Sequence, residues 1–255
     1  MLVRCRTRLP LQALAPLYLD DGTAYLMLLN PTGGLLGGDC LTTRIVQGAG
    51  THVCLTTPSA TRVYRSASQP AVSNVNIRLG DGAALEYLPD HVIPHAGSLL
   101  RQSLRVEMAP HSRAILWDAF AAGRLACGER WAFRRLDSRT EVMFGARPAF
   151  ITSTRIRPLE RPPQRLGVMG DYDYSASLVL VADAFEKWKE LIAGLAEELR
   201  GLPELWGGVS PLGCGGCVVK FLTRSASVLL LGQKRLWARA RESLLGKSSF
   251  NLRKY

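Results

Sequence analysis

Short apolar segments separated by turn residues recur at regular spacing through the first 165 residues of the chain. Segments 25–29, 51–57 and 74–79 are followed by Asn-Pro, Pro and Gly-Asp-Gly, respectively. The pattern continues in segments 99–108, 114–117, 131–136 and 140–144. Strands at this spacing are typical of stacked sheets, a sandwich or a barrel rather than of alternating strands and helices. This part of the chain is therefore predicted to be mainly β.

A proline-rich, polar segment at 158–170 follows these strands and is predicted to be a long surface loop. The chain of 255 residues is long enough to bury one large core. We expect a single domain over residues 1–255, with 158–170 as the candidate internal boundary.

Two helices are predicted after this loop. Asp183, followed three residues later by Glu186, forms a capping-box pattern, and apolar residues at helical spacing predict a helix over about 183–200. A second, basic helix is predicted over about 235–245. Strands are predicted between the two helices, at 213–222 and 227–231.

Apolar runs in this chain are far shorter than the roughly 18 to 20 residues that cross a bilayer, so no membrane span or membrane partner is expected. The charged residues at the N-terminus are not followed by the apolar stretch of a secretory leader. We therefore expect a cytoplasmic protein. In that compartment the six cysteines are expected to be reduced thiols rather than a disulfide framework.

The formal net charge of +11 raises the possibility of nucleic-acid binding. However, many of the arginines are interleaved with acids, and no DNA- or RNA-binding motif accompanies them. Nucleic acid is thus the less favoured partner, and a basic surface that docks acidic proteins is the better prediction. The second helix would provide such a surface if Arg235, Arg239 and Arg241 face outward.

Enzyme motifs are missing. The Gly-Lys-Ser at 246–248 has Arg241 where a phosphate-binding loop needs glycine, and the glycines at 33–38 are out of phase with a dinucleotide-binding turn. No nucleophile elbow occurs, and no set of nucleophile, base and oxyanion donors can be assembled. The chain is therefore predicted not to be an enzyme.

Two pairs of metal-binding residue types also need an interpretation. Cys214 and Cys217 form a C-x-x-C without the second ligand pair of a structural zinc site, so they are interpreted as thiols in a glycine-rich strand turn. His91 and His95 would be roughly 13 Å apart on a strand, so they could share one ion only if the chain turns between them.

Four polar blocks contain the most distinctive residues of the chain. The first, N-P-T-G-G-L-L-G-G-D at 30–39, ends a glycine-rich loop with a carboxylate. The second, at 56–66, reads T-T-P-S-A-T-R-V-Y-R-S, and the third, at 82–89, reads G-A-A-L-E-Y-L-P. The fourth, at 117–130, holds W-D and G-E-R.

In this order and spacing, the four blocks resemble those of the urease accessory protein UreD family, called UreH in some organisms. The resemblance covers nearly the whole chain, because it continues in a glycine-rich strand and a basic helix at 206–246. It implies a mainly β fold with stacked sheets in a β-helix-like arrangement and two α-helices. It also implies a chaperone that binds the urease apoprotein and, with UreF-like and UreG-like accessory proteins, delivers nickel to the urease active site through an internal polar tunnel.

Matching the family's polar positions to this sequence gives candidate residues for a transient nickel path. They are Asp39, Thr61 and Asp118, with Glu86 and Glu129 as weaker candidates. Hard carboxylates and hydroxyls suit this role because they release Ni²⁺ where clustered Cys or His would trap it. No cofactor is expected to be permanently bound, and Ni²⁺ is expected only in transit.

Two alternatives remain open. Each candidate could instead be a buried acid paired to an arginine such as Arg62, Arg65 or Arg124. The chain as a whole could be a basic binding module for an acidic protein or nucleic acid, with no role in urease maturation.

Overall fold

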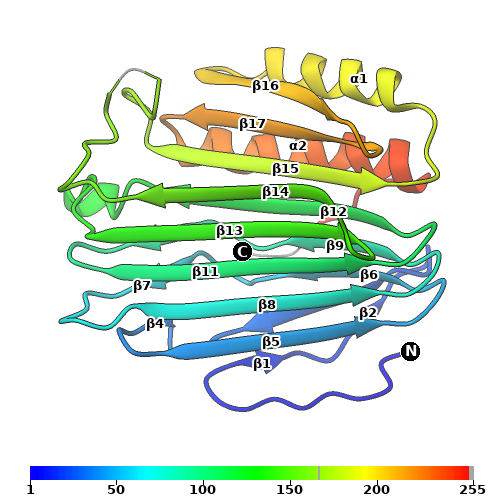
Figure 1. Ribbon diagram of the computed structural model, residues 1–255, viewed down its shortest axis with the longest axis horizontal. Coiled ribbons are helices and arrows are strands. Elements are labelled where there is room, and N and C mark those ends of the chain that lie inside the picture. Colours follow the sequence, from blue (N-terminus) through cyan, green and yellow to red (C-terminus); the bar gives the residue numbers. More distant parts are fainter. Residues whose placement is uncertain (166, 253–255) are drawn as a thin grey trace.

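The computed structural model describes residues 1–165 and 167–252, and its strands wind into stacked coils (Figure 1). The first coil contains β3 (Ala24–Leu29), β4 (Gly34–Leu35) and β5 (Cys40–Gln47). The second contains β6 (His52–Thr56), β7 (Thr61–Val63) and β8 (Ala71–Leu79). The third contains β9 (Ala84–Leu88), β10 (Val92–Pro94) and β11 (Leu99–Met108). The fourth contains β12 (Arg113–Ala121) and β13 (Arg135–Phe144).

Corresponding strands of successive coils pair in parallel, which builds two facing sheets. The described residues form a twelve-stranded and a five-stranded sheet. Beyond the fourth coil the sheets are extended by four antiparallel strands, β14 (Arg147–Ile156), β15 (Tyr174–Ala182), β16 (Leu205–Leu212) and β17 (Gly216–Thr223). Near the N-terminus, β3 pairs with two short strands, β1 (Gln12–Ala13) and β2 (Leu17–Tyr18). The predicted mainly β, β-helix-like stack is thus confirmed.

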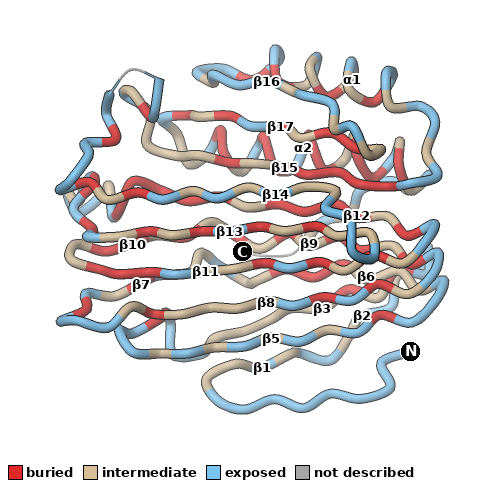
Figure 2. Tube along the Cα trace, in the orientation of Figure 1, coloured by how far each residue is buried: buried red, intermediate tan, exposed pale blue. Residues whose placement is uncertain are grey.

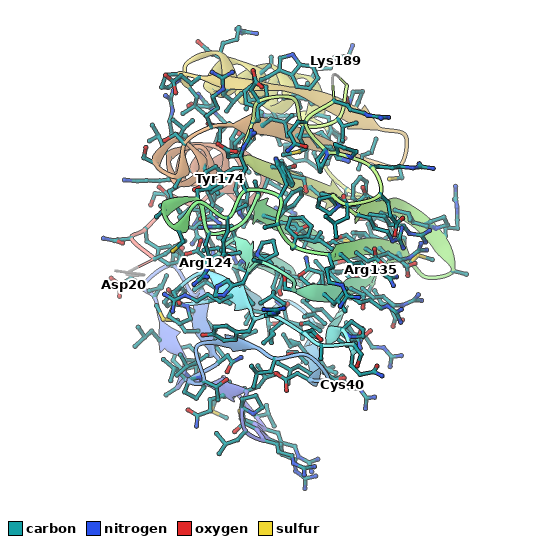
Figure 3. All side chains as sticks on the ribbon, turned by 90° about the vertical axis from the view of Figure 1, so that its left-hand side faces the viewer. Asp20, Cys40, Arg124, Arg135, Tyr174 and Lys189 are labelled. Carbon is teal, nitrogen blue, oxygen red and sulfur yellow. The ribbon has the colours of Figure 1, made fainter. Side chains whose placement is uncertain are left out.

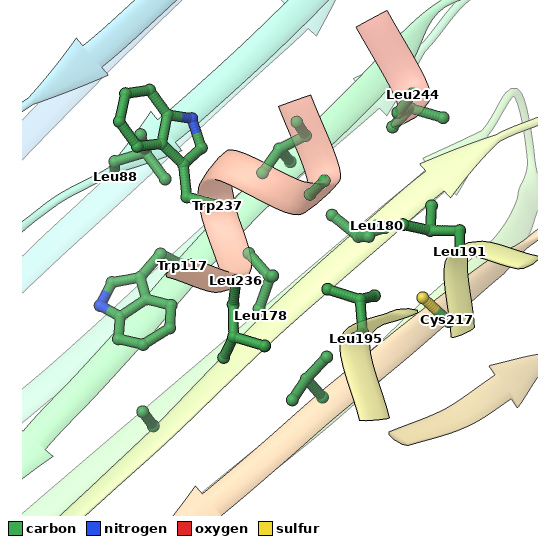
Figure 4. Packing of buried hydrophobic residues seen from close by; sticks show 14 of the residues in the cluster. Leu88, Trp117, Leu178, Leu180, Leu191, Leu195, Cys217, Leu236, Trp237 and Leu244 are labelled. Carbon is green, nitrogen blue, oxygen red and sulfur yellow. The ribbon is translucent and has the colours of Figure 1, made fainter. Parts of the chain in front are cut away.

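Two layers of hydrophobic core result from the alternation of side chains along the strands (Figure 2). On β15, Val179 and Val181 point between the two sheets, whereas Leu178 and Leu180 point toward the helices. Figure 4 shows this second layer, in which Leu178 and Leu180 pack with Leu236 of α2 (Ala226–Leu245). Both faces of the larger sheet are therefore buried, which explains its continuous apolar runs.

The first predicted helix exists but begins later than expected. Helix α1 spans Trp188–Arg200, and Lys187 at its N-cap position makes no capping hydrogen bond through its side chain. The carboxylate of Asp183 instead accepts a hydrogen bond from the His111 backbone N–H, at 3.0 Å. The expected capping box at residues 183–186 is therefore wrong, because its acid is used in a contact with a distant turn.

The second helix is longer than predicted. Helix α2 begins at Ala226, so the segment 227–231 is helical and its prediction as a strand is wrong. Ser225 caps the helix by accepting a hydrogen bond from the Val228 N–H, and Val228 and Leu229 are buried. A short apolar run does not distinguish strand from helix by periodicity alone, which accounts for the error.

Two strand boundaries also differ from the prediction. Strand β13 begins at Arg135 rather than near 131, because Trp131 adopts a left-handed backbone with φ 57° and the chain stays irregular up to residue 134. Strand β17 begins at Gly216 rather than 213, since Gly215 turns the β16–β17 hairpin with φ 85°.

The predicted loop 158–170 lies between β14 and β15, and residue 166 is outside the described residues. The larger sheet contains strands from both sides of this loop. Among the described residues, neither helix has the length and apolar character needed to cross a membrane.

Arg241 of α2 is fully buried, so the expectation that it faces outward is wrong. Its guanidinium forms ion pairs with Glu86 of β9 and with Asp21, and it donates to the Ser248 carbonyl at 2.8 Å. The ring of Phe250 lies 4.8 Å from the guanidinium carbon. Arg241 therefore joins the helix layer, the larger sheet and the segment after α2.

The Asp21–Arg241 pair makes the fold sensitive to acid. Partial burial alone would raise the pKa of Asp21, but hydrogen bonds from Thr23 and the charge of Arg241 lower it from 3.8 to about 2. This contribution to stability is present above about pH 4 and is lost as the pH falls toward 2. Between pH 5 and pH 2, we expect the free energy of unfolding, measured in urea, to fall by about 1 kcal/mol less in Asp21→Asn than in wild type. This value is reduced because Asp21 is partly exposed. An equal loss in both proteins would contradict this assignment.

Candidate functional site

A cavity of about 190 Å³ lies between the two sheets. Its lining extends from Leu28 and Leu41 in the first coil to Asp118 and Ser138 in the fourth, so it follows the axis along which the coils stack. The polar residues around it include Thr57, Thr61, Ser73, Tyr87, Asp90, Gln102, Asp118, Ser138 and Thr140. It is thus a partly open space whose lining mixes these polar side chains with apolar ones.

Asp118 reaches from β12 in the larger sheet toward two strands of the smaller sheet. Its carboxylate accepts long hydrogen bonds from Gln102 Nε2 and Ser138 Oγ, both at 3.4 Å, while Gln102 also donates to Ser138 at 2.9 Å. Burial raises the pKa of Asp118, although these hydrogen bonds and the positive charge of Lys220 oppose the shift. The loose contacts leave the carboxylate oxygens able to accept a further ligand.

Thr61 and two residues absent from the sequence prediction line the same cavity. The backbone of Thr61 on β7 is fixed by its N–H, which donates to the His91 carbonyl at 3.0 Å. Asp90 is 4 % exposed and lies in the turn that leads into β10. Burial and the nearby negative charge of Asp118 raise the pKa of Tyr87, which keeps its hydroxyl neutral. Carboxylates and hydroxyls from several coils therefore surround one space.

Asp39 and Glu129 do not line this cavity. The Asp39 carboxylate accepts a hydrogen bond from the Leu36 N–H at 2.8 Å and so closes the glycine-rich turn before β5. Glu129 is paired with Arg124, at the end of the coils that faces the viewer in Figure 3. Hydrogen bonds from Arg124 and from the Ala96 N–H lower the pKa of Glu129 to about 2. Both acids hold loops outside the cavity.

Glu86 points to the opposite face of the larger sheet, toward α2. Besides its ion pair with Arg241, it accepts hydrogen bonds from Trp237 Nε1 at 2.5 Å and from His52 Nε2 at 2.7 Å. His52 is set to donate there because its Nδ1 faces the ammonium of Lys247, a group that can only donate, at 2.8 Å. Glu86, Arg241, Asp21 and His52 thus form one group of ionisable side chains, here called the buried ion cluster.

The cysteine and histidine pairs are also apart from the cavity. Cys217 is buried, which raises the pKa of its thiol to about 12, and Cys214 donates to the Ala149 carbonyl at 3.0 Å. His91 pairs with Asp90 at 2.8 Å, whereas His95 packs edge-on against Tyr64. Among the described residues, no three His, Cys, Asp or Glu side chains gather as a metal site.

Comparison with known proteins places this chain in a family. The model of the family described as UreD urease accessory protein matches residues 1–254. The chain belongs to the UreD family. The urease accessory protein UreD of Herpetosiphon aurantiacus is 35% identical over 94% of this chain and 85% of its own length. That of Deinococcus radiodurans is 34% identical over 99% of this chain and 89% of its own length, and that of Mycolicibacterium gilvum is 32% identical over 94% and 88%.

The polar blocks by which the chain resembles the UreD family have different positions in the fold. The second block supplies Thr57 and Thr61 to the cavity, and the fourth supplies Asp118. The first and third blocks also reach the cavity, through Asn30 and Tyr87, but they hold Asp39 in a turn and Glu86 in the ion cluster. The blocks therefore combine residues of the cavity with residues that build its frame.

Gln102 and Ser138 were missed, although the sequence contains a signal for them. Gln102 alternates with Leu100 and Leu104 on the inward face of β11, where an apolar residue is expected. A polar residue at a position whose neighbours on the same face are core leucines indicates an internal polar space. This signal marks such positions without saying which strands bring them together.

Proposed function

We propose that this protein acts in urease maturation, binding the urease apoprotein and, with UreF-like and UreG-like accessory proteins, delivering nickel to the urease active site. The cytoplasm is the proposed location. The observation that carries the proposal is the cavity between the sheets, whose lining includes Asp118, Asp90 and Thr61, inside a chain of the UreD family.

The chemistry of the cavity suits a cation that must be passed on. Carboxylate and hydroxyl oxygens are hard ligands that bind Ni²⁺ more weakly than clustered thiolates or imidazoles do. Asp118 and Asp90 supply carboxylates from buried positions, and hydroxyls of Thr61 and Ser138 supply neutral oxygens along the way. In this proposal Asp118 and Thr61 remain candidate nickel contacts and Asp90 is added to them, whereas Asp39, Glu86 and Glu129 hold the frame.

Reconstitution in a host that carries the urease structural and other accessory genes tests this function. Cells with the wild-type protein are expected to contain active urease, cells without it are expected to contain nickel-free apoprotein, and the tagged protein is expected to co-purify with that apoprotein. Absence of both activation and co-purification would refute the proposal. Retention of the protein on nucleic acid at physiological salt would then favour the basic binding module.

A further inference from the structure

A row of polar residues continues beyond the cavity, from Asp118 to the edge of the two-sheet stack. In the larger sheet, Asp118 of β12 pairs in register with Ser177 of β15, and Ser177 pairs with Lys220 of β17. Neighbouring strands lie about 4.8 Å apart, so this row extends the path by about 10 Å. Because all three residues occupy the same row across paired strands, their side chains share the face that looks between the sheets.

The smaller sheet supplies a matching polar surface opposite this row. Ser138 of β13 pairs in register with Thr154 of β14, and Thr140 pairs with Thr152. These four residues alternate with outward-facing positions, and Ser138 and Thr140 are buried. Hydroxyl groups therefore face the row from Asp118 to Lys220 where the two sheets overlap.

The open cavity ends at Asp118, and Lys220 lies at the other end of the row. Ser177, Thr152 and Lys220 are absent from the cavity lining. Within the described residues, β14 is the last strand of the smaller sheet, so the sheets part beside it. The ammonium of Lys220 bridges this margin by donating to Thr152 Oγ1 at 3.3 Å.

We infer that Lys220 is a gate at the surface end of the row beyond Asp118, and this inference rests on the proposed nickel route. The gate controls the passage of a divalent cation along the row. An ammonium at the end of the row repels a dication, as fixed positive charges do in selective pores. Its one hydrogen bond to a neutral hydroxyl is weak, and its four-carbon stem is flexible. The exposed side chain can therefore swing outward and open the row.

Nickel transfer to urease apoprotein tests the gate with variants that separate its charge from its length. Lys220→Met is expected to raise the initial rate of urease activation at limiting nickel by about tenfold. Lys220→Arg, which keeps the charge, should stay near the wild-type rate. Lys189→Met removes an equal charge from exposed α1 and is the control for net charge. An unchanged rate in Lys220→Met, or the same increase in Lys189→Met, would overturn the gate while leaving wild-type activation intact.

A second readout needs no urease and so separates failure of the gate from failure of the proposed function. Ser177→Cys places a thiol between Asp118 and Lys220, in a background with the exposed Cys5, Cys40 and Cys127 changed to serine. Adding Lys220→Met should speed its modification by a trimethylammonium methanethiosulfonate by about tenfold. The same background without Ser177→Cys gives the rate of the remaining cysteines. If Lys220→Met changed only the thermal midpoint and not this rate, Lys220 would be structural and the gate would be rejected.

Discussion

Replacing Arg241 with methionine is expected to lower the free energy of unfolding by about 3–5 kcal/mol, because Glu86 would remain fully buried without its counter-charge. In a domain of this size such a loss corresponds to a fall of about 10 °C in the midpoint of thermal unfolding. Differential scanning calorimetry at pH 7 measures it directly. Methionine keeps much of the packing volume, so the loss reports the charge rather than a cavity.

Arg239→Met is the matched control, since Arg239 lies on the same helix with its side chain 39% exposed and pairs with Glu198 at 3.5 Å. Exposed pairs contribute about 0–1 kcal/mol, so this variant should unfold close to wild type. The double variant Arg241→Met/Glu86→Gln should recover part of the stability, because it removes both buried charges. Equal losses in Arg239→Met and Arg241→Met would show that the buried cluster has no special role.

Asp118→Asn is expected to reduce urease activation by at least about tenfold without loss of folded protein. The amide keeps the size of the carboxyl but removes the negative charge that would hold a dication in the cavity. Urease activity and bound nickel, measured in the reconstituted host, report this loss. Because burial disfavours the ionised Asp118 carboxyl, the variant should also unfold at a temperature no lower than wild type at pH 7.

Asp39→Asn provides the comparison for this variant, because Asp39 closes a turn outside the cavity. Asp39→Asn should lower the free energy of unfolding more clearly than it lowers urease activation. Co-purification with urease apoprotein should be retained by Asp118→Asn, which would separate nickel passage from partner binding. Full activation by Asp118→Asn would exclude its carboxylate as a required nickel contact.

Much of the stack of coils was predictable because each strand has a local sequence pattern of apolar residues bounded by turn residues. The segment 99–108 coincides with β11, and 25–29 and 74–79 lie inside β3 and β8. Pairing between coils was not visible as a sequence repeat. One inward row joins Leu26, Leu55, Tyr87 and Leu116, and parallel pairing requires only that such residues fit the same layer, not that they be identical.

The residues that were misjudged depend on partners far away in the sequence. Arg241 is one cation of a basic segment, and nothing in the neighbouring sequence indicates that it will pair with Glu86, 155 positions earlier. Thr61 and Asp118 lie in polar blocks of the sequence, but the cavity that they share depends on the stacking of coils. The family resemblance selected Glu86 as well, because matching blocks does not reveal on which face of a strand a side chain lies.

The buried ion cluster also has a consequence for synthesis of the chain. Glu86 leaves the ribosome long before Arg241, so the nascent larger sheet carries an acid without its counter-charge while the remaining coils are made. Only when α2 has been translated can this acid be neutralised by its partner and the apolar face of the sheet be covered. The fold is therefore completed only after α2 has been translated. A chain arrested before Arg241 would expose the apolar face of an incomplete sheet, which favours aggregation.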